Sequence, residues 1–168
     1  MRRLYLAAAG TLALAACQPA AKPAVTAVAP GDFSALATEP RTVAQVSADI
    51  ASGASTAEAA TKFYLDRIAA VDDAGPKLNA VLAINPNALA NAQALDGLTK
   101  GGVARGPLHG VPILIKDNIE SNDPMPTTAG SLALQANVTN RDSPVAARLR
   151  AAGAVILGKT NLSEWANF

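Results

Sequence analysis

The chain has 168 residues, of which 14 are basic and 13 acidic, and its net charge is +1 at pH 7. This length suits one domain of ordinary size or a piece of a larger one. The small net charge argues against a surface that binds nucleic acid through a strong positive field, so we expect no nucleic-acid partner. A single Cys and a single His exclude an intramolecular disulfide and disfavour a Cys/His zinc site. We therefore expect neither a metal nor a cofactor.

Residues 1–16 have the pattern of a secretory signal peptide. Arg2 and Arg3 form a short basic start, and the apolar run that follows, residues 4–14, is too short to span a bilayer. The four residues that end at Cys17, Leu-Ala-Ala-Cys, resemble the lipobox of bacterial lipoproteins, in which this cysteine carries the lipid. The resemblance implies a membrane partner that is reached through acyl chains. Ordinary signal cleavage beside a chance cysteine is the alternative.

The residues after Cys17 indicate where an anchored chain would lie. Gln18 follows the cysteine, and by the same resemblance a residue other than Asp there permits transfer to the outer membrane. We expect an exported protein that is lipid-anchored to the bacterial cell envelope, at the outer membrane or the periplasmic face. Residues 17–40 are rich in Pro and Ala and predict an extended tether, so the folded region is expected to begin at Arg41.

The first part of the folded region carries two helix patterns. Thr42 can cap a helix that places Val43, Val46 and Ile50 on one face and that Gly53 ends. Residues 55–58, Ser-Thr-Ala-Glu, match a capping box and predict the start of a second helix. The apolar residues of this second helix recur at helical spacing and define its expected inner face: Ala60, Phe63, Tyr64, Ile68 and Val71.

Strand patterns begin at residue 80 and alternate with helices, which predicts an α/β fold. Residues 80–84 and 154–157 predict short strands. Residues 111–115 are apolar at successive positions, as in a strand that is covered on both faces.

The helices between these strands have recognisable ends. Asn85-Pro86 would begin a helix that carries Leu89, Ala92 and Leu95. Asp142 or Ser143, followed by Pro144, would begin another, and residues 161–164 would open a last one. Glycines bound the turn that precedes the middle strand and also end the helix from Pro144: Gly97, Gly101, Gly102, Gly106 and Gly153.

Two motifs have ordinary structural explanations. Residues 153–160 match the phosphate-binding pattern G-x-x-x-x-G-K-[ST], but their four middle residues are Ala, Val, Ile and Leu, which favour a strand over a flexible loop. We therefore expect no nucleotide site there. His109 lies in a loop that leads into a strand, and we expect it to satisfy a turn, since the sequence marks no catalytic partners for it.

Lys116 directly follows the apolar run of residues 111–115. We expect a buried sheet to enclose its stem while the amine reaches the edge of the sheet. Burial favours the neutral form of an amine, and a neutral amine can take a proton from a hydroxyl nucleophile. A solvated lysine that marks the end of a strand is the alternative, and spacing alone favours it.

A longer match of residues changes this balance. Residues 106–119, Gly-Pro-Leu-His-Gly-Val-Pro-Ile-Leu-Ile-Lys-Asp-Asn-Ile, together with residues 77–81, 125–131, 142–149 and 153–164, resemble the N-terminal part of the amidase signature family. The resemblance runs from about Arg41 to residue 168. It implies an α/β fold of which this chain holds the N-terminal portion: a mixed β-sheet covered by helices, incomplete in these residues.

The resemblance also implies a chemistry. Enzymes of this family use a serine nucleophile, a second serine joined by a cis peptide bond, and a lysine that matches Lys116. The lysine would act as general base through the bridging serine and return the proton to the leaving amine, and water would then hydrolyse the acyl-enzyme. Asp117 and Asn118 would have supporting roles.

Two further segments match parts of the family that lie near the active site. The loop of residues 127–131 would lie beside it, with Thr128, Gly130 and Ser131 as candidate substrate contacts. Residues 161–168 would approach the pocket for the acyl group.

The glycine- and serine-rich segment that carries both family serines comes after the match at residues 159–161, and these 168 residues do not contain it. None of the serines that follow Lys116 lies in such a run: Ser121, Ser131, Ser143 and Ser163. We expect the chain to be an N-terminal third of an exported amidohydrolase that acts on a small-molecule or peptide amide, and to be inactive alone. Alternatives are a protein like the glutaminase-type component of glutamyl-tRNA(Gln) amidotransferase, which the export signal disfavours, and a short non-enzymatic envelope lipoprotein.

Overall fold

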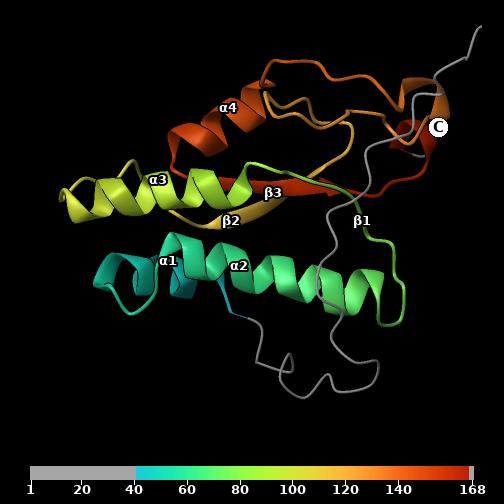
Figure 1. Cartoon of the computed structure of the whole chain (residues 1–168). Coiled ribbons are helices and arrows are strands. Elements are labelled where there is room, and N and C mark those ends of the chain that lie inside the picture. Colours follow the sequence, from blue (N-terminus) through green and yellow to red (C-terminus); the bar gives the residue numbers. More distant parts are fainter. Residues whose placement is uncertain (1–40, 167–168) are drawn as a thin grey trace, which may run out of the picture.

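A computed structural model describes residues 41–166 of the chain. The predicted signal peptide, Cys17 and the tether up to residue 40 lie outside the described residues. The described elements confirm the predicted α/β class (Figure 1). In chain order they are α1 (Val43–Ser52), α2 (Ala57–Arg67), the π-helical segment η2 (Ile68–Asp73), β1 (Val81–Ile84), α3 (Ala88–Lys100), β2 (Pro112–Lys116), the 3₁₀ turn η3 (Leu132–Leu134), α4 (Pro144–Ala151), β3 (Val155–Thr160) and the 3₁₀ turn η4 (Glu164–Ala166).

The three strands form one mixed sheet in the order β1-β3-β2. β3 runs antiparallel to β1 and parallel to β2. Parallel neighbours need a crossover connection, and the chain between β2 and β3 includes α4. The carboxyl ends of β2 and β3 therefore lie at the same edge of the sheet.

Helices cover both faces of this sheet. On one face, Val155 and Leu157 of β3 form a core with residues of α2 and α3, and Leu114 of β2 packs against it. On the other face, Ile156 packs with Ile115, with residues of the loop after β2, and with α4. Figure 1 shows α2 on one side of the strands and α4 on the other. The expectation that the strand of residues 111–115 is covered on both faces is confirmed, because Leu114 packs against one core and Ile115 belongs to the other.

A bulge in β3 decides which side chains point to which face. Ile113 of β2 pairs with Ile156, but the next residue, Leu114, pairs with Gly158, so Leu157 is an extra residue in β3. An extra residue reverses the alternation of the strand beyond it. Lys159 therefore points to the same face as Ile156, and not into the apolar core on the side of Leu157.

The local patterns at two helix starts are confirmed. Thr42 caps α1 through a full capping box with Gln45, and Gly53 ends the helix with a φ of 77°. Ser143 caps α4, where its hydroxyl accepts from the N–H of Ala146 at 3.2 Å, and Pro144 occupies the first turn. Of the two caps that the sequence left open, Ser143 is therefore the one used.

The start of α2 is shifted by one residue from the prediction. Thr56, and not Ser55, is the cap, with its hydroxyl accepting from the N–H of Ala59. The carboxylate of Asp96 in α3 accepts from the N–H groups of Ala57, at 2.7 Å, and Glu58, at 2.9 Å. The first N–H groups of α2 are thus satisfied by a carboxylate that is distant in the sequence, whereas a capping box would satisfy such groups with side chains from residues 55–58.

Two other helix predictions are wrong in position or extent. α3 begins at Ala88 rather than at Asn85-Pro86, buries Ala88 while Leu89 is exposed, and continues through Gly97, which is therefore not a turn residue. The helix expected from Asn161 is only a 3₁₀ turn as far as residue 166, and Trp165 interrupts it with a φ of 53°.

Candidate active site

Lys116 is the last residue of β2, and its Cα partner in β3 is Thr160. Both strands end here, and the carboxyl ends of parallel strands are where α/β sheets bind ligands. Among the described residues, the side chain of Lys116 is exposed. The expectation that the sheet encloses its stem is therefore wrong for this part of the chain, while its position at the edge of the sheet is as expected.

A tight turn follows Lys116 directly. The N–H of Ile119 donates to the carbonyl oxygen of Lys116 at 2.9 Å, and the N–H of Asp117 donates to that of Thr160 at 3.1 Å. Asp117 is buried, and its carboxylate accepts from the N–H of Thr128 at 3.2 Å and also from the Thr128 hydroxyl. The turn is thus bonded both to β3 and to the loop of residues 127–131.

The loop of residues 127–131 lies against the segment that follows β3. The N–H of Ala129 donates to the carbonyl of Asp117 at 3.2 Å, and the N–H of Trp165 donates to the carbonyl of Ala129 at 2.8 Å. Gly130 has a φ of 76°, and a Cβ there would lie 3.0 Å from the backbone of Glu164, so only glycine fits without displacing that segment. The strand end, the loop and residues 162–165 therefore form one contiguous surface.

The three candidate substrate contacts differ in exposure. Thr128 and Gly130 are half-buried, whereas Ser131 is buried. The Thr128 hydroxyl gives its proton to Asp117 and accepts from the N–H of Gly130 at 3.0 Å. Since a hydroxyl has one proton, Thr128 has none left to donate to a substrate in this arrangement.

Lys159 is the residue of this region that the sequence analysis missed. It is fully buried, and its ammonium donates to the carbonyl oxygen of Ile119 at 2.6 Å and to the Thr127 hydroxyl at 2.8 Å. Burial lowers the pKa of Lys159 below the ordinary lysine value, and the negative charges of Asp117, Asp123 and Glu120 partly oppose this shift. The sequence held a signal for Lys159, because it follows the strand residues 155–158 just as Lys116 follows the apolar residues 111–115.

An ion-pair network lies beside Lys159. Arg150 of α4 pairs with the buried carboxylate of Asp123 and, at 2.9 Å, with Asp142. The Asn85 amide donates to Asp123 at 2.9 Å and to the carbonyl of Ile156 at 2.8 Å. This network ties the loop after β2 to α4 and to the end of β1.

His109 has the structural role that the sequence predicts. It is buried, and its Nδ1 accepts from the N–H of Arg105 at 3.0 Å. Nε2 therefore carries the proton, and it lies 2.8 Å from the Thr99 hydroxyl and 3.2 Å from the carbonyl of Leu95. Nδ1 is thus bonded within the loop before β2, and Nε2 joins that loop to α3.

The phosphate-binding pattern at residues 153–160 does not form a phosphate loop. Its residues from Val155 onward are the strand β3, as expected from their composition. Among residues 41–166, no group of three or more His, Cys, Asp or Glu side chains could hold a metal ion, and no helix in that range is long and apolar enough to span a membrane.

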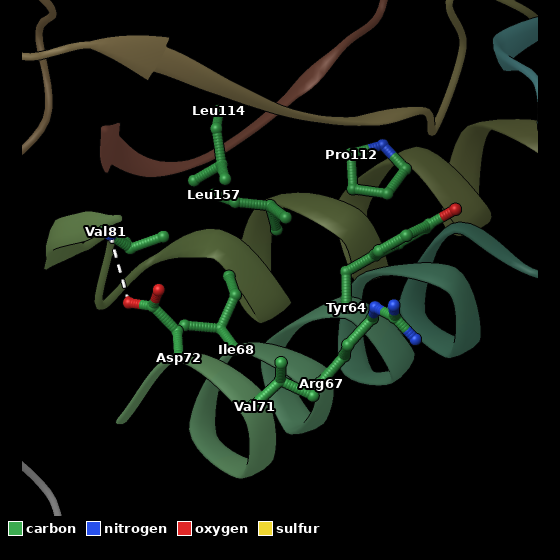
Figure 2. A pocket seen from close by; sticks show the side chains of 9 residues that line it. All are labelled: Tyr64, Arg67, Ile68, Val71, Asp72, Val81, Pro112, Leu114 and Leu157. Atoms are coloured by element: carbon green, nitrogen blue, oxygen red, sulfur yellow. Dashed lines mark hydrogen bonds between the residues drawn. The ribbon is translucent and has the colours of Figure 1, made fainter. Parts of the chain in front are cut away.

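A cavity of about 290 Å³ lies elsewhere, between α2–η2 and the sheet. Figure 2 shows Leu114, Leu157 and Pro112 on its sheet side, facing Tyr64 and Ile68 of the helical side. The one acidic residue that lines the cavity, Asp72, already has backbone partners: its carboxylate accepts from the N–H groups of Ala80 at 2.8 Å and Val81 at 3.1 Å. Since the cavity opens on the face opposite Lys159, it is separate from the candidate active site.

A family model described as Amidase matches residues 59–168, and the chain belongs to this family.

Solved structures and curated relatives agree with this assignment. The peptide amidase from Stenotrophomonas maltophilia is 52% identical with a TM-score of 0.72, over 74% of this chain and 25% of that one. An amidase family protein from Bacillus anthracis is 36% identical with a TM-score of 0.69, over 76% of this chain and 25% of that one. A glutamyl-tRNA(Gln) amidotransferase component from Thermobifida fusca is 47% identical over 124 residues, which are 73% of this chain and 24% of that protein. The predicted fold is confirmed, and the chain spans about a quarter of the length of each of these relatives.

Proposed function

We propose that the complete protein carrying this sequence is a serine amidohydrolase, which converts a carboxamide to a carboxylate and ammonia or an amine. The observation that carries this proposal is the place of Lys116. It ends β2 at the sheet edge where ligands bind, inside the region that matches the amidase family. Lys116 would be the general base of the reaction, and its nucleophile and bridging serine would come from outside these residues.

The geometry around Lys116 supports this role. A general base must be held at a fixed place relative to the hydroxyl that it deprotonates. The backbone of Lys116 is fixed on one side by β3 and on the other by the turn to Ile119, while its side chain is exposed at the edge. The amine is therefore available to a group that another part of the protein supplies.

The loop of residues 127–131 would form one wall for the substrate amide. Gly130 and Thr128 would contact the substrate, Thr128 only as a hydrogen-bond acceptor, and the buried Ser131 would contact it from the end of the loop. A small-molecule amide and the C-terminal amide of a peptide both remain candidate substrates. The 52% identity to a peptide amidase makes an amidated peptide the first substrate to test.

The proposal includes two statements about the protein as a polypeptide. The 168 residues alone would hydrolyse no amide, because they lack the glycine- and serine-rich segment of the family. The protein would be exported and held at the cell envelope by lipid on Cys17. Replacing the anchor residue, Cys17→Ser, should move the expressed protein from the detergent phase to the aqueous phase, and unchanged partitioning would contradict the anchor.

A second candidate function rests on the relatives. The chain is 47% identical to a glutamyl-tRNA(Gln) amidotransferase component, and a protein of that type would release ammonia from glutamine. Incubating the complete protein with an amidated dipeptide, with an aliphatic amide and with glutamine separates the two. Ammonia from the dipeptide or the aliphatic amide supports the hydrolase, and release from glutamine alone would replace it with the amidotransferase type.

A further inference from the structure

Lys159 is a buried cation that the proposed mechanism does not use. Its side chain has no exposed surface, and the bulge at Leu157 directs it away from the apolar core and toward the turn after Lys116. A buried ammonium group is costly unless it is hydrogen-bonded and faces negative charge. Both conditions are met here, which marks the arrangement as a built feature of this edge of the sheet.

The first hydrogen bond of Lys159 acts on the turn that begins at Lys116. Its ammonium binds the carbonyl oxygen of Ile119 at 2.6 Å, and the N–H of the same residue closes the turn onto the carbonyl of Lys116 at 2.9 Å. In the sheet, Lys159 is also the Cα partner of Ile115, the residue before Lys116. Lys159 therefore holds the backbone on both sides of Lys116.

The second hydrogen bond of Lys159 acts on the neighbouring loop. The Thr127 hydroxyl accepts from the ammonium at 2.8 Å, and the next residue, Thr128, is bonded to the carboxylate of Asp117. The turn and the loop are thus joined twice, once through Lys159 and once through Asp117. The carboxylates of Asp117, Asp123 and Glu120 supply the negative charge that the ammonium faces.

We infer that Lys159 is a positioning residue for Lys116: its ammonium fixes the turn of residues 116–119 against the loop of residues 127–131. This inference rests on the proposed function for its catalytic consequence. A displacement of about 1 Å in a reacting group costs on the order of a hundredfold in rate, so loss of this hydrogen-bonded link should lower kcat.

The test uses three variants of the complete protein and one control. Lys159→Met keeps most of the side-chain volume and removes the donor, Thr127→Val removes the acceptor, and Thr127→Ser keeps a hydroxyl. Lys100→Met, at the exposed end of α3, is the matched control. Hydrogen exchange is measured at the amides of Ile119 and Ala129, with the core amide of Val155 as reference.

We expect Lys159→Met and Thr127→Val to speed exchange at Ile119 and Ala129 by at least about tenfold relative to Val155, because they open the region locally. Thr127→Ser and the control should keep the wild-type pattern. If Lys159→Met fails to fold, the comparison of exchange rates between Thr127→Val and Thr127→Ser tests the inference. Wild-type exchange at both amides in Thr127→Val, or equal acceleration at Val155, would overturn the inference.

Kinetics distinguish positioning from simple structural support. We expect Lys159→Met and Thr127→Val, corrected by active-site titration, to lose kcat by about ten- to a hundredfold, with KM changed much less. A wild-type kcat in a variant whose turn exchanges faster would overturn the positioning role. A wild-type protein that hydrolyses no amide would instead contradict the proposed function, which separates the two failures.

Discussion

The buried carboxylate of Asp117 accepts hydrogen bonds from both the backbone N–H and the hydroxyl of Thr128. Asp117→Asn keeps the shape of the side chain but replaces one acceptor oxygen with a donor that faces these groups. We expect a loss of about 1–3 kcal/mol in the free energy of unfolding, the usual cost of an unsatisfied buried polar group. Urea denaturation measures it. The control is Asp66→Asn, which removes one partner of the exposed Lys62–Asp66 ion pair. Equal losses of unfolding free energy in the two variants would contradict the account.

Gly158 and Gly97 form a matched pair for testing how closely β3 lies against β1. A Cβ on Gly158 would overlap with the carbonyl oxygen of Ala83 in β1, whereas nothing lies within 4 Å of a Cβ on Gly97 in α3. Gly158→Ala should therefore destabilise the protein by more than about 3 kcal/mol. Gly97→Ala should stabilise it by about 0.5–1 kcal/mol, because alanine favours a helix interior. Thermal unfolding of both variants checks this, and a harmless Gly158→Ala would show that the strands are spaced differently.

His109 should matter for stability and not for chemistry. His109→Ala removes two buried hydrogen-bonding positions and leaves a cavity, so we expect a loss of about 2–4 kcal/mol in the free energy of unfolding. The kcat of the folded fraction at low temperature should stay within about threefold of wild type. A kcat that falls by much more than this in a variant of unchanged stability would assign His109 to the reaction instead.

The lowered pKa of Lys159 predicts a pH dependence of stability. Burial favours the neutral amine in the folded protein, so between the lowered pKa and the ordinary lysine value near 10.4 the unfolded chain binds more protons. Stability contributed at this site therefore rises with pH across that window. Denaturation of wild type and Lys159→Met at several pH values should show the difference in unfolding free energy shifting in favour of wild type as pH rises. A difference that is independent of pH would contradict the burial effect.

Local patterns predicted much of the fold, and distant contacts account for what they missed. Thr42, Ser143 and Gly53 act through residues within one helical turn, so their roles follow from the sequence. At the start of α2 the cap is Thr56, and the N–H groups of Ala57 and Glu58 donate to Asp96, which lies in another helix and which no pattern around residues 55–58 contains. The expected capping box was therefore placed one residue early.

The candidate site shows the same division. The position of Lys116 at a strand end follows from the apolar run before it, and its proposed role as general base comes from the family resemblance. The contribution of Lys159 depends on the bulge at Leu157, which reverses the face to which the following side chains of β3 point. A strict alternation of faces along the strand would not predict this reversal. The exposure of Lys116 among the described residues agrees with the alternative that spacing alone favoured, a solvated lysine at the end of a strand.

The central claim is that Lys116 is the general base of an amidase, and one comparison of rates tests it most directly. The complete protein and its Lys116→Ala variant are assayed for ammonia release from an amidated dipeptide, with Lys100→Ala as the control. The thermal unfolding midpoint of each variant is measured alongside, so that a loss of catalysis is distinguished from a loss of folding. The account predicts that Lys116→Ala loses at least about a thousandfold in kcat while the control keeps wild-type activity. Near-normal turnover by a folded Lys116→Ala would contradict it.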